Sequence, residues 1–484
     1  MVSYSTTDVP QNQSPKIRNN FAYPASEPFS PGYVPEPGYR PGLVYPAAGA
    51  FSDPSPEAQN PLVRHTEKIG GADSEGLVVA KNRRFQLQRV AAELLAGSTC
   101  DRVCRCMKDL VTDKSGAKHT MVDIYRCDAA QDAFFRNVFC CNYAWSCPVC
   151  GAKLSEQKRE EIEAGIKVWH KSKRSTLHAT MTCRYYRGEA CRGAKKRIQS
   201  AFTQFWNSKS VRGLRRAYKI AGYLYALEPL VNIAADGVGW HIHYHVVLFF
   251  DDLLVENDDI SVLEAIMAHH WADVVGSIEG GYASKKHGLR LSSGHQDLSE
   301  YLTKYDRLPV AIPESFSKEV TKNHLKASKK GLSPVDLLVA YEATQEPEIG
   351  DLFLEFSETF KGTHQIRWSN GLKQKIGALS IGLALVGIDI SKKSEPEPGP
   401  ELLKQEYNLI CQISGKCWEE VYNLGLIGKV LMVAAYQGDY ALREFLEEHG
   451  IKDCYYPRIE EWERLGLRPG EYFSIDLAKL WEEC

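Results

Sequence analysis

Polar and apolar residues alternate most clearly in the stretch 239–250, which reads GWHIHYHVVLFF. Successive side chains of a β-strand point to opposite faces, so its three histidines share one face. The unbroken apolar run 246–250 predicts a strand that is buried on both sides. Two neutral imidazoles two positions apart on a strand can chelate one metal ion, which favours a metal site over a solvated strand edge. The three histidines are His241, His243 and His245.

The same reading predicts a mixture of helices and strands along the rest of the chain. Asp236-Gly237 is a hairpin signal between two of the strands. Helices and antiparallel strands mix without βαβ regularity, so the core is predicted to be α+β. After the last predicted helix, a loosely patterned stretch runs to about Lys392. The predicted helices are 155–169, 194–210, 259–275 and 296–305, and the predicted strands are 175–185, 222–232, 239–250 and 288–293.

Composition divides the chain into four parts. Residues 1–62 hold 12 of the 23 prolines, which is typical of an extended tail without a packed core. Residues 100–160 form a cysteine-rich segment, and residues 161–375 form the predicted α+β core. A linker, SEPEPGPE, leads into an acidic and mainly helical C-terminal region, 393–484.

The 484-residue chain has no apolar run of the roughly 18 residues that a membrane span needs. Its N-terminus has neither a basic start nor an apolar segment, so we expect no secretion signal and a cytoplasmic protein. In that compartment its 14 cysteines are expected to be thiols or metal ligands rather than disulfides.

A net charge of −2 hides a strong asymmetry along the chain. Residues 151–219 hold 18 Lys and Arg against 5 acidic residues, whereas 393–484 hold 10 against 18. Basic residues interleaved with aromatic ones suit a nucleic acid, whose phosphates pair with cations and whose bases stack on rings. The alternative is a set of solvated helix faces. The aromatic residues are Trp169, Tyr185, Tyr186, Phe202, Phe205 and Trp206.

Glu228 lies across the predicted hairpin from the histidines. A turn centred on Ala235–Asp236 pairs residue 228 with His243, and a turn centred one residue later pairs it with His245. Both registers place the carboxylate on the histidine face. Two histidines and a glutamate with open positions suit Mg²⁺ or Mn²⁺ held partly by a substrate phosphate, rather than a closed zinc site. His241 is the rival third ligand.

One face of the predicted helix 296–305 carries Asp297, Tyr301 and Lys304, at positions i, i+4 and i+7. Tyrosine can be a covalent nucleophile, and a nearby cation or metal favours its phenolate over the neutral form that its pKa of about 10 dictates at pH 7. Lys304 can equally neutralise a substrate phosphate. Taken alone, the pattern is more typical of a packed ring beside a solvated amine; the histidines upstream favour a catalytic role.

Together these motifs resemble the HUH endonucleases, and most closely the plasmid replication initiators of the rolling-circle type. The resemblance rests on His243-Tyr-His245 followed by apolar residues and on Tyr301-Leu-Thr-Lys304 about 55 residues later. The phrases HATMTCRY, YALEPLVN and IRWSNGL resemble the family's first strand, its Glu-bearing strand and a downstream motif. The resemblance covers about residues 125–375.

The resemblance implies a five-stranded antiparallel sheet with the two histidines at its centre and the tyrosine on an adjacent helix. It implies that Tyr301 nicks one strand of single-stranded or supercoiled origin DNA, forming a 5′-phosphotyrosine and a 3′-hydroxyl that a polymerase extends. In some relatives a glutamate four residues before the tyrosine activates water, and here that position is Asp297. Glu300 and Tyr305 rank second for the auxiliary and nucleophile roles. The chain has no P-loop motif, so a host helicase would separate the strands.

The stretch CCNYAWSCPVC predicts a structural zinc site. Tetrahedral Zn²⁺ takes four N or S ligands, and Cys141, Cys147 and Cys150 supply three. The segment also resembles the cysteine-rich segment that precedes the nuclease core in relatives of these initiators. A redox C-x-x-C is the alternative, but no thioredoxin-like βαβ pattern surrounds it. The fourth ligand is open among Cys127, which is our first choice, and Cys104, Cys106 and Cys140.

Two further functions fit parts of the sequence. An HUH transposase or mobilisation relaxase would share the nick-and-join chemistry and differ in the DNA that it recognises. A zinc-containing DNA-binding regulator with a degenerate nuclease core is the third candidate, and the intact His243, His245 and Tyr301 set argues against it.

Overall fold

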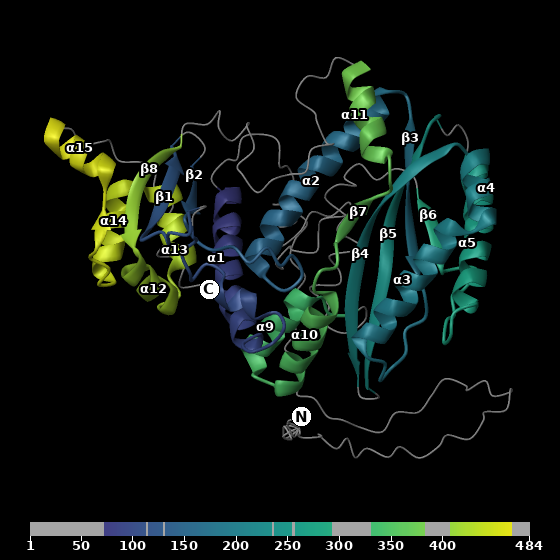
Figure 1. Cartoon of the computed structure of the whole chain (residues 1–484), viewed down its shortest axis with the longest axis horizontal. Coiled ribbons are helices and arrows are strands. Elements are labelled where there is room, and N and C mark those ends of the chain that lie inside the picture. The colour runs from purple at the N-terminus through teal and green to yellow at the C-terminus, as the bar shows by residue number, and fades with distance from the viewer. Residues whose placement is uncertain are drawn as a thin grey trace, which may run out of the picture. The chain divides into compact units, whose positions relative to one another are not determined.

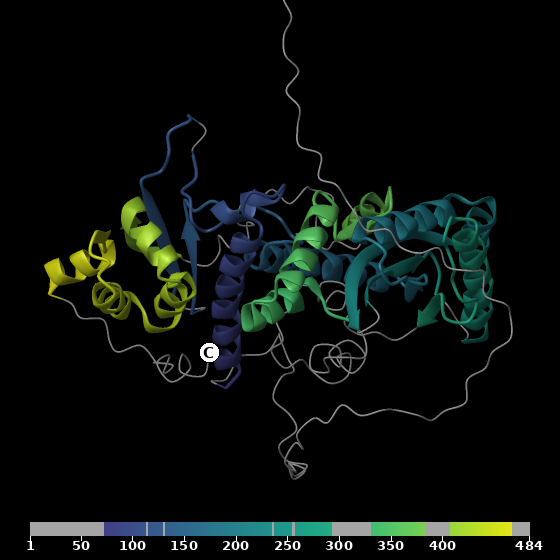
Figure 2. The ribbon, with the colours of Figure 1, turned by 90° about the horizontal axis from the view of Figure 1, so that it is seen from below.

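The structure is a computed structural model that describes residues 72–112, 115–128, 131–234, 237–253, 257–292, 331–382 and 407–466 (Figures 1 and 2). The proline-rich tail 1–62, the linker and the predicted helix 296–305 lie outside the described residues.

A five-stranded antiparallel sheet forms the centre of the larger part of the chain, and its mixture with helices confirms the predicted α+β class (Figure 1). The alternating stretch around the histidines is its middle strand, and residues 246–250 are each at most 1% exposed, as the apolar run predicted. In sheet order the strands are β6 (Leu289–Ser292), β3 (Ser175–Thr182), β5 (Gly237–Phe250), β4 (Ile220–Ala234) and β7 (Ile366–Trp368).

Helices pack on both faces of this sheet because its central strands are apolar on both sides. On the histidine face, Phe249 of β5 packs edge-on against Trp169 of α2 (Pro148–Lys171), and α11 (Leu372–Gly382) joins the same apolar cluster. On the other face, Phe202 stacks on Tyr244 with ring centroids 4.0 Å apart. The helices of that face are α3 (Cys191–Asn207), α4 (Lys209–Ala217) and α5 (Asn257–Gly276).

The stretch after residue 330, which the sequence left without assigned elements, supplies α11, the edge strand β7 and two further helices. Helix α9 (Pro334–Thr344) begins at a capping box in which Ser333 and Asp336 exchange side chain to backbone hydrogen bonds. Helix α9 packs on α10 (Pro347–Phe360), and α1 (Ala72–Leu94) contacts both of them (Figure 2). The short 3₁₀ helix η2 (Asp101–Arg105) follows α1.

A second sheet joins the cysteine-rich segment to the C-terminal region. Its order is β2 (Asp132–Arg136), β1 (Met121–Cys127), β8 (Asn408–Ser414) and β9 (Cys454–Tyr455), all antiparallel. The described part of the C-terminal region, which the sequence predicted to begin at residue 393, thus completes a sheet that begins at Met121. The helical elements that follow β8 are α12 (Gly415–Asn423), α13 (Ile427–Met432), the π-helical turn η5 (Val433–Gln437), α14 (Asp439–Glu448) and α15 (Pro457–Leu465).

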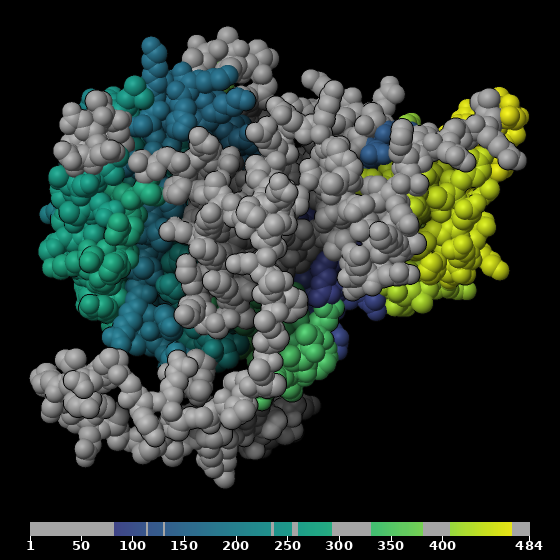
Figure 3. Space-filling model, turned by 180° about the vertical axis from the view of Figure 1, so that it is seen from behind, coloured from purple at the N-terminus to yellow at the C-terminus, as the bar shows by residue number. Residues whose placement is uncertain are grey.

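Helix α1 packs against these C-terminal elements as well. It contacts α13, and Arg89 Nη2 donates to the carbonyl oxygen of Asn423 at 3.2 Å. The space-filling view shows atoms of α1, in purple, next to those of the C-terminal elements, in yellow (Figure 3). The mainly helical character predicted for this region is seen in its described residues, with the strands β8 and β9 added.

Candidate metal centres

The β4–β5 hairpin places Glu228 directly opposite His243. The register Ala234↔Gly237 closes the hairpin and pairs Glu228 with His243, which is the first of the two predicted registers. Because side chains on paired residues lie on the same face, the carboxylate shares the face of His243 and His245. The next positions on that face, Val247 and Phe249, lie in the apolar core.

The three side chains converge on one carboxylate oxygen. Glu228 Oε2 lies 2.7 Å from His243 Nε2 and 2.6 Å from His245 Nε2. Their ligand atoms all lie within 4.8 Å of one another. Both imidazoles are buried and Glu228 is nearly so, which makes this cluster a fixed set of donors inside the fold.

His241, the rival third ligand, is engaged elsewhere. Its Nε2 lies 2.8 Å from the hydroxyl of Thr182 on β3, and its ring stacks against that of His243. Burial and, next, the neighbouring His243 lower the pKa of His241 to about 4, although Glu228 acts in the opposite direction. His241 is therefore a neutral imidazole beside the cluster rather than one of its three converging ligands.

The structure adds His178, which the sequence analysis did not single out. It lies on β3 and is 4% exposed, with its Nε2 3.3 Å from Nδ1 of His245 and its Nδ1 3.3 Å from the hydroxyl of Ser292. A metal-binding histidine almost always donates its second ring nitrogen to such a partner, which fixes the tautomer. The alternation in HATMTCRY predicts on which face of its own strand residue 178 lies. It does not predict which other strand pairs with that one.

The cluster fits a divalent cation on its own chemistry. Octahedral Mg²⁺ at about 2.1 Å from its ligands holds neighbouring ligand atoms about 3 Å apart, close to the spacing of the carboxylate oxygen and the two imidazole nitrogens. His243 differs from His245 in one respect: its Nδ1, the ring nitrogen not in contact with Glu228, is buried and has no hydrogen-bond partner among the described residues. An ionised carboxylate with two neutral imidazoles suits Mn²⁺ or Mg²⁺, with positions left for water or substrate oxygens.

The predicted nucleophile helix, with Asp297, Tyr301 and Lys304, lies outside the described residues, as do the second-ranked Glu300 and Tyr305. The last described residue before this predicted helix is Ser292, whose hydroxyl lies 3.3 Å from Nδ1 of His178.

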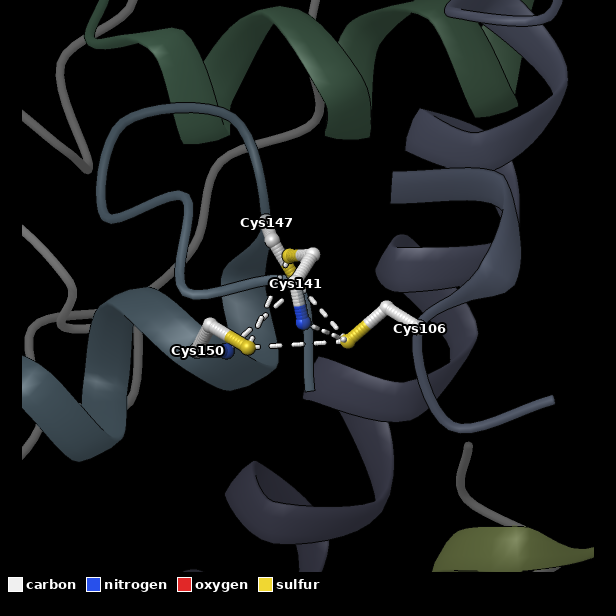
Figure 4. Close-up of side chains that lie close together, drawn as sticks. All are labelled: Cys106, Cys141, Cys147 and Cys150. Atoms are coloured by element: carbon white, nitrogen blue, oxygen red, sulfur yellow. Dashed lines mark hydrogen bonds between the residues drawn. The ribbon is translucent and has the colours of Figure 1, made fainter. Parts of the chain in front are cut away.

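The cysteine cluster is formed by one thiol from the chain after η2 and three from residues 141–150 (Figure 4). Cys106 Sγ lies 3.5 Å from Cys150 Sγ and 3.7 Å from Cys147 Sγ, and Cys141 Sγ lies 3.6 Å from Cys150 Sγ. Four sulfurs at about 2.3 Å from a tetrahedral zinc ion would be about 3.8 Å apart, so the thiols already have the required spacing.

Backbone amides also point at this thiol group. The amides of Cys141, Tyr143 and Cys150 point at the sulfurs of Cys106, Cys141 and Cys147, at 3.4 to 3.5 Å. Burial raises the pKa of the Cys147 thiol well above its ordinary value, with hydrogen bonds from neighbouring thiols acting in the same direction. Four buried thiolates are stable together only around a cation such as Zn²⁺.

The choice of Cys127 as the fourth zinc ligand is wrong for this structure. Cys127 ends β1, pairs with Asp132 of β2 and is not in the group, whereas Cys106 is. The four buried thiols could hold a metal ion such as zinc, as predicted for the other three cysteines.

Four of the six aromatic residues thought to stack on bases belong to the core. Trp169, Phe202, Phe205 and Trp206 are between 0% and 6% exposed and pack against the sheet or one another. Their spacing in the basic stretch reflects the buried faces of α2 and α3 and not a stacking platform.

Comparison with models of known protein families, with curated proteins and with solved structures found no match to this chain. The helices of the described residues include none that is both long and apolar enough to cross a membrane.

Proposed function

We propose that the protein is a metal-dependent endonuclease that nicks single DNA strands with a tyrosine nucleophile and initiates rolling-circle replication of a plasmid. The observation that carries the proposal is the convergence of Glu228, His243 and His245 on neighbouring central strands of an antiparallel sheet. The resemblance of the sequence motifs to HUH replication initiators supports the choice among metal-dependent reactions.

Glu228, His243 and His245 would hold Mg²⁺ or Mn²⁺, which when bound supplies positive charge to polarise the scissile phosphate. With a metal ion on Nε2 of His245, the ring proton would sit on Nδ1 and be donated to Nε2 of His178, 3.3 Å away. His241 stays neutral at pH 7, because burial lowers its pKa to about 4, and so adds no competing charge. Together these residues would hold the metal ion, and with it the scissile phosphate, at a fixed position on the sheet.

Tyr301 is the proposed nucleophile. Its phenol oxygen forms a bond to phosphorus, and the bond from phosphorus to the 3′-oxygen breaks. The phenol gives up one proton and the departing 3′-oxygen takes one up, so one ester replaces another and no co-reactant is needed. Lys304 would neutralise the phosphate, and Asp297 would activate water for release. The 3′-hydroxyl primes a host DNA polymerase, and a host helicase opens the duplex.

The chain permits this arrangement. Ser292, beside His178, and Tyr301 are nine residues apart (301 − 292), and nine residues span at most about 30 Å. The nucleophile can therefore reach the cluster that the histidines define.

A covalent-capture assay tests the proposal. Single-stranded oligonucleotides that tile the DNA around the gene carry a label at the 3′ end, because the protein would remain on the 5′ end of the downstream fragment. We expect a labelled adduct on a denaturing gel that needs Mn²⁺ or Mg²⁺ and is absent in Tyr301→Phe and His243→Ala, while Tyr305→Phe keeps it. An adduct in Tyr301→Phe, or full activity in excess EDTA, would refute the assignment.

A further inference from the structure

The outer surface of α3 and α4 carries positive charge that is largely unpaired among the described residues. Residues 191–217 contain eight Lys and Arg and no Asp or Glu. Five of these cations are exposed and form no ion pair with any described residue. They are Arg192, Lys196, Lys209, Arg212 and Arg216.

The cations lie in stripes along the two helices. On α4, Lys209, Arg212 and Arg216 stand at i, i+3 and i+7 and share one face. On α3, Arg192 and Lys196 begin a stripe that continues in uncharged amides and hydroxyls. A surface hollow of about 650 Å³ follows this stripe and is lined by three cations of α3, by its amides and hydroxyls, and by Thr359 of α10.

We propose that this α3–α4 face binds the phosphate backbone of double-stranded DNA. Lysine, arginine, amide and hydroxyl side chains are the groups that contact phosphates in protein–DNA complexes. The choice of DNA as the polyanion rests on the proposed function; the site itself does not, because it is separate from the histidine cluster.

A duplex fits this face better than a single strand does. Proteins that hold single strands stack the bases on exposed aromatic rings. The aromatic side chains of α3, Phe202, Phe205 and Trp206, are all buried, and α4 has none. A surface with cations but no rings binds the outside of a helix, without reading its sequence.

A membrane surface fits less well. Helices that lie on anionic lipid insert large apolar side chains beside their cations. Of the large apolar side chains that are exposed among the described residues, none belongs to α3 or α4.

The face lies on the side of the sheet opposite the candidate catalytic cluster. Phe202 of α3 stacks on Tyr244, whereas His243 and His245 flank Tyr244 in sequence and point the other way. The protein would therefore grip a duplex on one side of the sheet while a separate single strand reaches the histidines on the other.

The test is duplex affinity as a function of salt, measured by fluorescence anisotropy with the full chain and a labelled duplex of arbitrary sequence, without added Mg²⁺ or Mn²⁺ so that cleavage is suppressed. The variant is the double substitution Arg212→Gln and Arg216→Gln. The matched control, Lys416→Gln with Lys452→Gln, removes two exposed cations from the C-terminal region. Circular dichroism checks that both variants fold.

We expect the arginine variant to bind about tenfold or more weakly and to lose about 1.8 from the slope of log K against log salt, since each phosphate contact contributes about 0.9. The control should match the wild type. Equal slopes of log K against log salt for the variant and its control would overturn the inference. So would a single strand that binds as tightly as the duplex and loses the same affinity in the arginine variant. Binding to phosphatidylserine vesicles that the variant loses, with duplex binding intact, would also overturn it. A failed covalent-capture assay would leave this result standing, so the two proposals fail separately.

Discussion

His178 Nε2 lies 3.3 Å from His245 Nδ1, across the pairing of β3 with β5. The two rings stack with their centroids 5.4 Å apart, and Ser292 holds the far side of His178. For Nε2 of His245 to bind a metal, the ring proton must sit on Nδ1, and His178 is the group that accepts it. The neighbouring strand thus selects the tautomer that the site needs.

Replacing His178 with alanine should therefore weaken metal binding more than it weakens the chemical step. We expect the Mn²⁺ concentration needed for half-maximal cleavage to rise by about 10- to 100-fold, with the rate at saturating Mn²⁺ largely kept. The Mn²⁺-induced rise in Tm should shrink in parallel, a readout that does not depend on cleavage.

The matched control is His170→Ala, which removes an exposed imidazole from α2 whose Nε2 lies 2.9 Å from the hydroxyl of Thr176. Its Mn²⁺ dependence should equal that of the wild type. Equal Mn²⁺ requirements in the His178 and His170 variants would show that His178 is a core histidine without a positioning role.

The cysteine cluster gives a paired prediction. Wild-type protein and Cys127→Ser should each carry about one zinc ion per chain. Cys106→Ser should lose most of its zinc, because Cys106, unlike Cys127, belongs to the group of four thiols. A closed thiolate site supplies folding energy, so Cys106→Ser should also expose residues 100–170 to protease. Elemental analysis and limited proteolysis measure the two effects.

A reversed outcome, with zinc lost from Cys127→Ser and kept by Cys106→Ser, would restore the ligand set expected from the sequence. Protein purified without chelators and found free of zinc would leave the four residues as buried thiols.

The features that the sequence predicted best are those set by local periodicity. The alternation around His243 fixed the strand and its face, and the parity of the hairpin placed Glu228 on that face in either register. Cys147 and Cys150 share one knuckle, so their proximity follows from spacing alone.

Features set by distant pairing left no such signal. Cys106 stands 35 residues before Cys141 in a segment without periodicity, and nothing local distinguishes it from Cys127. Asp123 of β1 meets Gln412 of β8 across 289 residues, so the C-terminal region looked like a separate unit. Charge and ring spacing in the basic stretch could not separate exposed arginines from buried aromatics until α3 was placed on the sheet.

Glu161 connects α2 to α11 and β7, and its ionisation should contribute to stability. Its carboxylate accepts from Trp368 Nε1 at 2.6 Å and pairs with Lys158 at 2.7 Å and Lys373 at 2.5 Å. Burial alone raises the pKa of Glu161, but the hydrogen bonds and charges of the two lysines outweigh it, so the pKa lies below its ordinary value of 4.5.

A lowered pKa in the folded state means that the stabilisation is complete above about pH 4.5 and is lost as the pH falls through the folded-state pKa. Glu161→Gln should therefore unfold more easily by about 1–2 kcal/mol at pH 7, and the difference from the wild type should narrow below pH 4.5. Urea titrations at pH 7 and at pH 3.5 measure the free energy of unfolding of both proteins. If the variant is less stable than the wild type by the same amount at both pH values, packing of the Glu161 side chain and not its charge accounts for the difference.

Ending the chain at Glu406 should destabilise the β1–β2 hairpin, although the two segments are far apart in sequence. Strand β8 lies between β1 and β9, so its loss would expose the edge of β1. Arg126 of β1 is fully buried and lies 3.7 Å from Asp439 of α14, which the truncation also removes. Arg126 keeps its pair with Asp128 at 3.0 Å, so losing Asp439 should cost less than the roughly 3–5 kcal/mol of a buried charge left with no partner. We expect rapid proteolysis within residues 121–136 of the shortened chain, and Asp439→Ala, which keeps β8, should show a milder form of the same defect. If the hairpin resists protease equally with and without residues 407–484, the C-terminal region is an independent domain and the shared sheet does not stabilise β1.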